Sequence, residues 1–179
     1  MLRVLTILAE GFEEIEAVTP IDLLRRAGVE VITAALGEGI HVTGRNGLTL
    51  HADTTLATIR EPDFDAILLP GGPGVKQLQA DERLRKLLRQ HHADGRWLAA
   101  ICAAPVVLQE AGILAGHRHT AHHSVASQLP EMLPGERCVV DGRILTSRGA
   151  GTALEFGLLL IELLVSREQA DEVKNSICA

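Results

Sequence analysis

The sequence predicts one α/β domain, a three-layer α/β/α sandwich of flavodoxin-like type in which helices cover both faces of a mostly parallel sheet. Short apolar runs alternate with helical patterns along the 179 residues. With 46% hydrophobic and 22% charged residues, the chain can form a full core. No internal repeat or low-complexity linker divides it, so we expect residues 1–179 to form a single domain.

The first elements are a strand, a helix, a strand and a hairpin. Arg3–Leu8 and Val29–Ala35 are apolar runs typical of buried strands, and Glu14–Ala27 between them has helical periodicity. The segment Gly37–Leu50 is rich in glycine and alternates in polarity. It predicts a β-hairpin that turns at Asn46–Gly47, a dipeptide favoured in tight turns.

The centre of the chain continues the alternation of strands and helices. Ala66–Leu69 predicts a buried strand that ends in the glycine-rich turn Pro70–Gly74. Asp81–His92 predicts an amphipathic helix whose leucines face the core. Trp97–Ile101 predicts the next buried strand.

The last third predicts a hairpin and two helices. Cys138–Val140 and Arg143–Thr146 flank an Asp-Gly turn and are expected to pair as strands. Helical patterns follow over Thr152–Val165 and Arg167–Ile177, and Ser166 is placed to cap the second helix.

Cys102 lies where the strand Trp97–Ile101 meets a helical pattern that has Pro105 in its first turn. Open α/β sheets hold ligands at the carboxyl ends of their strands, and free amides and the helix dipole lower a thiol pKa there. The small residues Ala103 and Ala104 leave the sulfur accessible, as in a nucleophile elbow. This segment alone is equally compatible with a cysteine that packs in the core.

Composition excludes several classes of protein. The net charge of −6, the scattered basic residues and the scarcity of aromatic residues argue against nucleic-acid binding. No apolar stretch approaches the roughly 20 residues of a membrane span, and the first segment is expected to be a core strand rather than a signal peptide. Three widely spaced cysteines predict neither a disulfide framework nor a zinc site. We therefore expect a reducing, cytoplasmic location.

Four ordered motifs, which span nearly the whole chain, resemble the ThiJ/PfpI superfamily and in particular its DJ-1 branch, which includes YajL-like protein and nucleotide deglycases. The motifs are AEGFEEIEAVTPIDLLRRAG, AILLPGG, AAICAAP and ILTSRGAGTALEFGL. The resemblance implies a pairing between Cys102 and a glutamate of the first helix, which corresponds to Glu16. A carboxylate beside a thiolate is a like-charge clash, so Glu16 would keep its proton, stabilise the thiolate and shuttle protons. The alternative for Glu16, and the default for Glu13 and Glu14, is a solvated carboxylate near the helix N-terminus.

The same resemblance implies an oxyanion hole formed by the backbone N–H groups of Gly72 and Ala103. A glycine-rich loop can instead bind phosphate, but no GK[ST] sequence follows this one. Many members of the branch carry a histidine near the cysteine at the position of His122, while others lack it. His123 and Ala150 stand where proline is common in the branch.

Two further groups of residues leave alternatives open. The histidine cluster 117–123 is compatible with a metal site, although no carboxylate or thiolate shares its spacing. Arg26, Arg45 and Arg148 correspond to basic positions near the pocket or dimer contact of the family, and equally fit ordinary surface arginines. For Cys138 we expect a packing role, and for Cys178 an exposed position.

The resemblance implies a cysteine-dependent glyoxalase III or deglycase that needs no metal or organic cofactor. Its substrates would be methylglyoxal, glyoxal or early glycation adducts on proteins and nucleotides, which would react at Cys102 through a hemithioacetal. The alternative is a redox sensor and chaperone of the oxidative stress response, in which the same cysteine becomes oxidised and the protein binds unfolded client proteins. The resemblance also implies a homodimer. A purely structural role is the third alternative. A Cys102 thiol that reacts no faster than an ordinary free cysteine would favour this role over the other two.

Two related enzyme classes do not fit the motifs. The protease-like branch has a histidine directly after the cysteine, where this chain has Ala103. Class I glutamine amidotransferases need a downstream His-x-Glu pair, and no histidine of this chain has glutamate two positions later.

Overall fold

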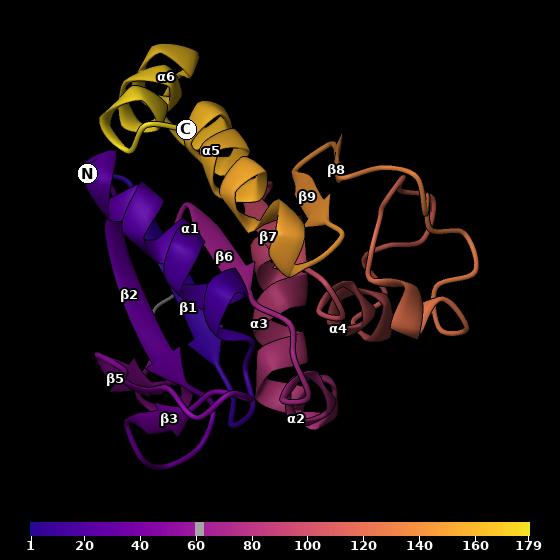
Figure 1. The fold of residues 1–179 in the computed structure, drawn as a ribbon. Helices are drawn as coiled ribbons and strands as arrows, with labels where there is room; N and C mark the ends of the chain where they lie inside the picture. The colour runs from indigo at the N-terminus through magenta and orange to yellow at the C-terminus, as the bar shows by residue number, and fades with distance from the viewer. Residues whose placement is uncertain (60–62) are drawn as a thin grey trace.

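A computed structural model of the protein describes residues 1–59 and 63–179 and shows a mostly parallel central sheet (Figure 1). Within this part of the chain, the strand order is β5-β2-β1-β6-β7-β9-β8, and only β8 runs antiparallel to its neighbour. The strands of the sheet are β1 (Arg3–Leu8), β2 (Glu30–Ala35), β5 (Thr54–Thr55), β6 (Ala66–Leu69), β7 (Trp97–Ile101), β8 (Cys138–Asp141) and β9 (Ile144–Ser147).

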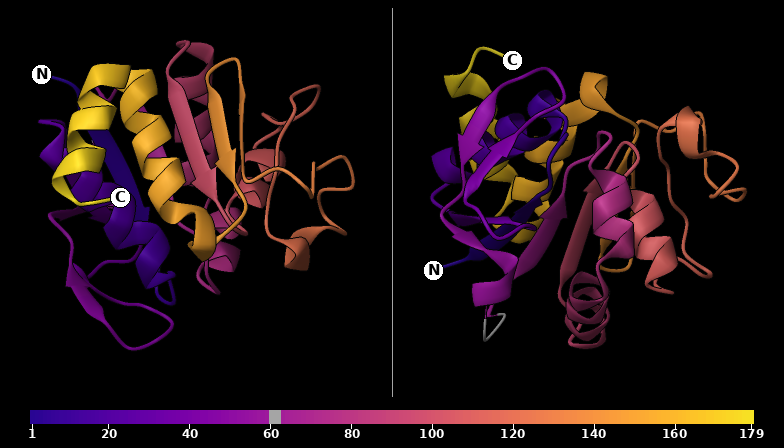
Figure 2. Two further views of the ribbon diagram at one scale, coloured as in Figure 1. Left: turned by 45° about the horizontal axis from the view of Figure 1, so that its top comes forward. Right: turned by 90° about the horizontal axis from the view of Figure 1, so that it is seen from below.

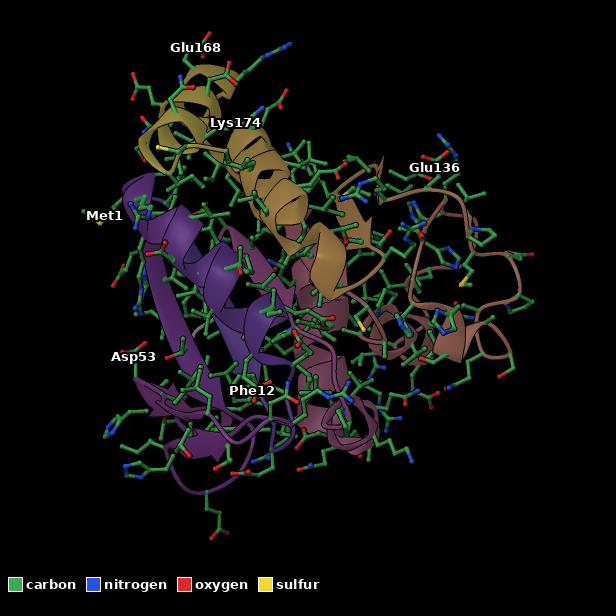
Figure 3. All side chains as sticks on the ribbon, viewed as in Figure 1. Met1, Phe12, Asp53, Glu136, Glu168 and Lys174 are labelled. Atoms are coloured by element: carbon green, nitrogen blue, oxygen red, sulfur yellow. The ribbon has the colours of Figure 1, made fainter. Side chains whose placement is uncertain are left out.

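Helices cover both faces of the sheet, which confirms the predicted three-layer α/β/α sandwich (Figure 2). One face carries α1 (Glu14–Arg26), α5 (Ala153–Leu164) and α6 (Arg167–Ser176), and the other carries α2 (Val75–Ala80), α3 (Glu82–Ala93) and α4 (Pro105–Glu110). Side chains fill the space between these layers, while charged residues such as Glu168 and Lys174 point outward from α6 (Figure 3). Residues alternate along each strand between the two faces, so the sheet separates two apolar clusters.

Two helices cross closely because one of them carries glycine at the contact. A Cβ atom on Gly157 of α5 would lie 2.6 Å from Leu23 Cδ1 and 3.1 Å from the Cα of Pro20 in α1. Pro20 also lacks the N–H that would bond the carbonyl of Glu16 one turn earlier. This close contact with α5 therefore holds α1, including the first turn of α1, against the sheet.

A small hairpin lies beside the start of α1. It consists of β3 (His41–Thr43) and β4 (Thr49–His51), and its turn contains Gly47 at φ +93°, as Asn46–Gly47 predicted. The backbone N–H of Asn46 donates to the Glu14 carboxylate at 2.6 Å, and its side-chain amide donates to the same group at 3.0 Å. These bonds hold the hairpin turn, including Arg45, near the carboxyl edge of the sheet.

Most elements match the sequence-based boundaries to within two residues, and the differences are short segments. The sequence did not predict α2 or β5. It also did not predict the 3-10 helices η1 (Leu56–Thr58), η2 (His123–Val125) and η3 (Ala150–Thr152). Within the described residues, no helix is both long and apolar enough to cross a bilayer.

Candidate active site

Cys102 forms a sharp elbow between β7 and α4, at the junction that the sequence predicts. Its backbone has φ 66°, a left-handed conformation that costs a residue with a side chain about 1 kcal/mol or more. Two hydrogen bonds hold it there: the Cys102 N–H donates to the carbonyl of Ser147 at 2.8 Å, and the N–H of His122 donates to the carbonyl of Cys102 at 2.8 Å. The strained turn presents the sulfur toward a cavity at the carboxyl edge of the sheet.

Glu16, from the first turn of α1, meets Cys102 across this edge. Its side chain is 1% exposed, hydrogen-bonds the Cys102 side chain, and accepts a hydrogen bond of 2.9 Å from the N–H of Gly71. Burial raises the pKa of the Glu16 carboxyl to about 7, and the nearby negative charge of Glu13 adds to this rise. Glu16 therefore retains its proton over a pH range in which ordinary glutamates are ionised.

The pKa of the Cys102 thiol is raised, whereas its position at a helix N-terminus was expected to lower it. Burial raises the pKa of this thiol to about 12, the Glu16 carboxylate contributes to the rise, and hydrogen bonds from the N–H groups of Ala103 and Gly72 oppose it. The helix α4 has only six residues, so its dipole is weak beside these effects. The two groups titrate as a pair that holds one proton between about pH 7 and about pH 12.

The glycines after β6 allow the loop to approach the pair. A Cβ atom on Gly71 would lie 2.6 Å from Glu16 Oε2 and 2.7 Å from Cys102 Cβ. Gly72 has φ +94°, and a Cβ atom there would lie 2.5 Å from the carbonyl oxygen of Gly11. Glycine is therefore required at both positions.

The solvated position expected for Glu13 is wrong, because this residue is buried at the start of α1, and the role of Gly71 was not predicted from the sequence. The Glu13 carboxylate caps α1 by accepting a hydrogen bond of 2.9 Å from the N–H of Glu16, and its own N–H donates to the carbonyl of Gly71 at 3.0 Å. The capping position just before the helix was the available signal for Glu13, and the paired glycines were the signal for Gly71. Together these bonds fix the position of Glu16 relative to the loop.

His122 lines the same cavity but contacts Cys102 through its backbone. Its Nδ1 accepts a hydrogen bond from the N–H of Ser124 at 3.3 Å and lies 2.8 Å from the Ser124 hydroxyl. Burial lowers the pKa of His122, and the neighbouring His123 and Arg45 contribute to the decrease. Because Nδ1 accepts a hydrogen bond, the neutral ring carries its proton on Nε2.

The histidine cluster of the sequence does not converge on one point. His117 Nδ1 lies 3.6 Å from Asp141 Oδ2, and His119 is buried with its Nδ1 2.8 Å from the carbonyl of His117. Within residues 1–59 and 63–179, no group of three or more His, Cys, Asp or Glu side chains is placed to hold a metal ion.

A cavity of about 510 Å³ opens above the Cys102–Glu16 pair. Residues from α1, the hairpin turn, the glycine loop, the elbow and the η2 segment line it. They are Glu13, Glu16, Arg45, Gly72, Pro73, Val75, Lys76, Gln79, Cys102, Ala103, Val106, His122, Ser124, Val125, Gln128 and Ala150. The predicted site residues Cys102, Glu16, His122, Gly72 and Ala103 thus lie around one cavity.

The other two cysteines lie outside this cavity. Cys138 is half-buried in β8, donates to the Ser147 hydroxyl at 3.3 Å, and has a pKa raised to about 11 by burial. Cys178 is exposed near the end of the chain.

Comparisons with known proteins identify the family. Residues 2–163 match the model of the DJ-1/PfpI family. The chain is 38% identical over 177 residues to protein dj-1beta of Drosophila melanogaster, a match that covers 97% of this chain and 95% of the fly protein. It is 33% identical over 172 residues to the glutathione-independent glyoxalase DJR-1.2 of Caenorhabditis elegans, covering 94% of this chain and 91% of the worm protein.

Solved structures show the same similarity. The crystal structure of Drosophila melanogaster DJ-1beta has a TM-score of 0.96 and 37% identity, with 99% of this chain and 98% of the fly chain covered. Oxidized DJ-1 of Toxoplasma gondii has a TM-score of 0.94 and 37% identity, with the same coverage. The chain therefore belongs to the DJ-1/PfpI family and, within it, to the DJ-1 branch that its motifs resemble.

Proposed function

We propose that the protein is a cysteine-dependent glyoxalase III or deglycase that acts on methylglyoxal, glyoxal or their early adducts on proteins and nucleotides. The observation that carries this proposal is the pairing of the half-buried Cys102 with the buried Glu16 at the floor of an open cavity. Similarity to a nematode glyoxalase that works without glutathione supports the same class of reaction.

The first step is addition of the Cys102 sulfur to the aldehyde carbon. For this step the shared proton moves from the sulfur to Glu16, so that the sulfur attacks as a thiolate, and the carbonyl π electrons move to oxygen. The N–H groups of Gly72 and Ala103, which face the sulfur, stabilise the new oxyanion. Glu16 then donates its proton to that oxygen, and a hemithioacetal results.

The second step moves hydrogen between adjacent carbons. A base, Glu16 or His122, removes the proton from the former aldehyde carbon, and the electron pair forms an enediol with the neighbouring ketone carbon. Reprotonation at the second carbon yields the lactate thioester of Cys102. Attack by water on this thioester releases lactate and regenerates the thiol, so methylglyoxal and water together account for all atoms of the product.

No step of this sequence requires a metal ion or an organic cofactor, because the carbon that is oxidised and the carbon that is reduced belong to the same substrate. In an early adduct on a protein or nucleotide, the sulfur would displace the amine from the carbinol carbon, and the amine would leave with the proton of Glu16, which gives the same hemithioacetal. A cavity of about 510 Å³ has room for a substrate larger than methylglyoxal.

The test is the loss of methylglyoxal and the appearance of lactate with three variants. Cys102→Ser should abolish turnover, since an alkoxide is not available at neutral pH, and Glu16→Gln should keep the shape of the site but lose proton transfer. Cys138→Ser is the matched control and should retain wild-type turnover, because that thiol lies outside the cavity. Undiminished turnover by Cys102→Ser would remove the mechanism.

A redox-sensing role with chaperone activity is the second candidate. The Cys102 side chain is only partly buried, and the protonated Glu16 beside it is placed to donate a hydrogen bond to an oxidised sulfur. Peroxide would convert the thiolate to sulfenate with release of water, and a second molecule of peroxide would convert the sulfenate to sulfinate, again with release of water. Mild peroxide should then modify Cys102 selectively and increase suppression of client aggregation. Oxidation that changes only turnover would contradict this role.

We also propose a cytoplasmic homodimer. Ile15 and Val18 on α1 are 53% and 39% exposed, and Leu48 at the hairpin turn is 50% exposed. Exposed apolar side chains on neighbouring elements are typical of a surface that a partner covers. Sedimentation of wild type and Ile15→Glu tests this: the variant should sediment as a monomer, and an unchanged mass for both would contradict the interface.

A further inference from the structure

A second cavity of about 350 Å³ adjoins the one that contains Cys102. The two cavities share His122 and Ala150 in their linings. The second also contacts Arg148 and the glycines on either side of Ala150, at the entrance to η3. A substrate whose reacting carbon lies at Cys102 can therefore extend a substituent past His122 into this second space.

Three cations line the walls of the two cavities. Arg45 and Lys76 line the first cavity and Arg148 lines the second. In the part of the chain that the structure describes, none of these three forms an ion pair within 4.0 Å. Arg137, which also lines the second cavity, differs because Glu155 pairs with it at 2.6 Å. The charge of Arg148 is thus available to a ligand.

Carboxylates near the site do little to cancel these charges. Glu13 is 8% exposed and is engaged in capping α1, while the rise in the pKa of Glu16 to about 7 keeps it largely neutral below that pH. The described residues that line the second cavity include no Asp or Glu. The chain as a whole carries a net charge of −6, so the positive charge around the cavities is local, and at physiological salt it acts over about 8 Å.

We propose that Arg148 and the second cavity form a subsite for an anionic substituent, a carboxylate or a phosphate, of the substrate that reacts at Cys102. The guanidinium offers a planar fork of N–H donors that matches either oxyanion. The proposal rests on the function proposed above and adds a substrate class, namely aldehydes or adducts that carry a negative charge close to the reacting carbon, of which glyoxylate is the smallest. Arg45 and Lys76 would assist entry of the same anion.

Alkylation of Cys102 tests the subsite without any turnover. Iodoacetate and iodoacetamide both transfer a two-carbon group to a thiolate with loss of iodide, and they differ by one negative charge. The rate with iodoacetamide reports changes at the thiol itself, so the ratio of the two rates isolates recognition of charge. Mass spectrometry of the peptide that contains Cys102 separates this thiol from Cys138 and Cys178.

The ratio of iodoacetate to iodoacetamide rates should be higher for Cys102 than for free glutathione, and Arg148→Gln should lower it roughly fivefold, as expected for one lost charge contact. Arg148 is the preferred position because Arg45 also acts on the pKa of Glu16 and His122. Arg167→Gln is the matched control: it removes the same charge at the start of α6, where the side chain lines neither cavity, and should leave the ratio unchanged. An unchanged ratio in Arg148→Gln, or an equal decrease in both variants, overturns the subsite.

Competition identifies the preferred anion. Inorganic phosphate and acetate, added at constant ionic strength, should slow the reaction of Cys102 with iodoacetate in the wild type and not in Arg148→Gln, and the stronger competitor names the oxyanion. If neither anion competes, the subsite is absent. Steady-state turnover of glyoxylate and of methylglyoxal then measures the effect on catalysis. The KM for glyoxylate should rise in Arg148→Gln, while the KM for methylglyoxal should not change. Because the alkylation ratio needs no turnover, the subsite and the glyoxalase mechanism can fail separately.

Discussion

Replacement of Glu16 by glutamine should change how the stability of the protein depends on pH. The ordinary pKa of 4.5 applies to Glu16 in the unfolded chain, and burial raises the pKa to about 7 in the folded protein. Between these values the folded protein holds a proton that the unfolded chain has released. Stability from this group is therefore fully present below pH 4.5 and is lost as pH rises through 7.

The size of the effect follows from the two pKa values. At about 1.4 kcal/mol for each pKa unit, the full loss is about 3 to 4 kcal/mol, and the part between pH 5 and pH 8 is about 2 to 3 kcal/mol. Glutamine has the same shape, can accept the hydrogen bond from Gly71, and does not ionise. The free energy of unfolding of wild type minus that of Glu16→Gln should therefore fall by about 2 to 3 kcal/mol over this interval, or about 5 to 10 °C in Tm.

Urea unfolding of both proteins at intervals between pH 5 and pH 8 measures this difference. His91 also contributes in this interval, because burial lowers its pKa to about 4 in the folded protein while the unfolded chain titrates near the ordinary value of 6.5, but this contribution is common to both proteins and cancels. Cys102→Ala in both backgrounds shows whether the thiol contributes. Curves that stay parallel within about 0.5 kcal/mol, the usual scatter for independent effects, would refute the raised pKa of Glu16 and the shared proton inferred from it.

Three further substitutions test the packing around the site and the fold. Gly71→Ala should slow alkylation of Cys102 strongly, because its Cβ would lie 2.6 Å from a Glu16 oxygen, whereas Gly151→Ala, with no atom within 4 Å of the new Cβ, should not. Gly157→Ala should destabilise the protein by about 1 to 3 kcal/mol through overpacking at the crossing of α1 and α5, with turnover retained at low temperature. Asp81→Ala should cost about 1 kcal/mol in urea unfolding, since its side chain caps α3 by accepting from Leu84 N–H at 2.9 Å, and equal stability would contradict that cap.

The parts of the fold that the sequence predicts are those with a long periodic pattern. The apolar run of β1 and the helical spacing of α1 each extend over enough residues to define their type. In contrast, α2 has six residues, which is less than two helical turns. The strand β5 has two residues, too few to show an alternation of polar and apolar side chains. Their form depends on contacts with the rest of the domain, and no local pattern records those contacts.

The position of Cys102 was predictable, but the pKa of its thiol was not. A strand, a cysteine and a proline at the next helix start define the elbow from local sequence alone. The rise in the pKa of Cys102 depends on its burial and on Glu16, which is distant in sequence and approaches only through the loop at Gly71. Effects of this kind come from packing between elements, so a local rule about helix dipoles predicted the wrong direction.

The reactivity of the site depends on which of two atoms keeps a single proton. Burial of the Glu16 carboxyl and the charge of Glu13 favour the proton on Glu16, while N–H donors from Gly72 and Ala103 stabilise a negative sulfur. These four contributions favour transfer of the proton from the sulfur to the carboxyl group, and they oppose the burial of the sulfur and the charge of an ionised Glu16, which favour the thiol. A thiolate can therefore form by proton transfer inside the pair, without loss of a proton to solvent, and a thiol with a raised pKa can still supply the nucleophile at neutral pH.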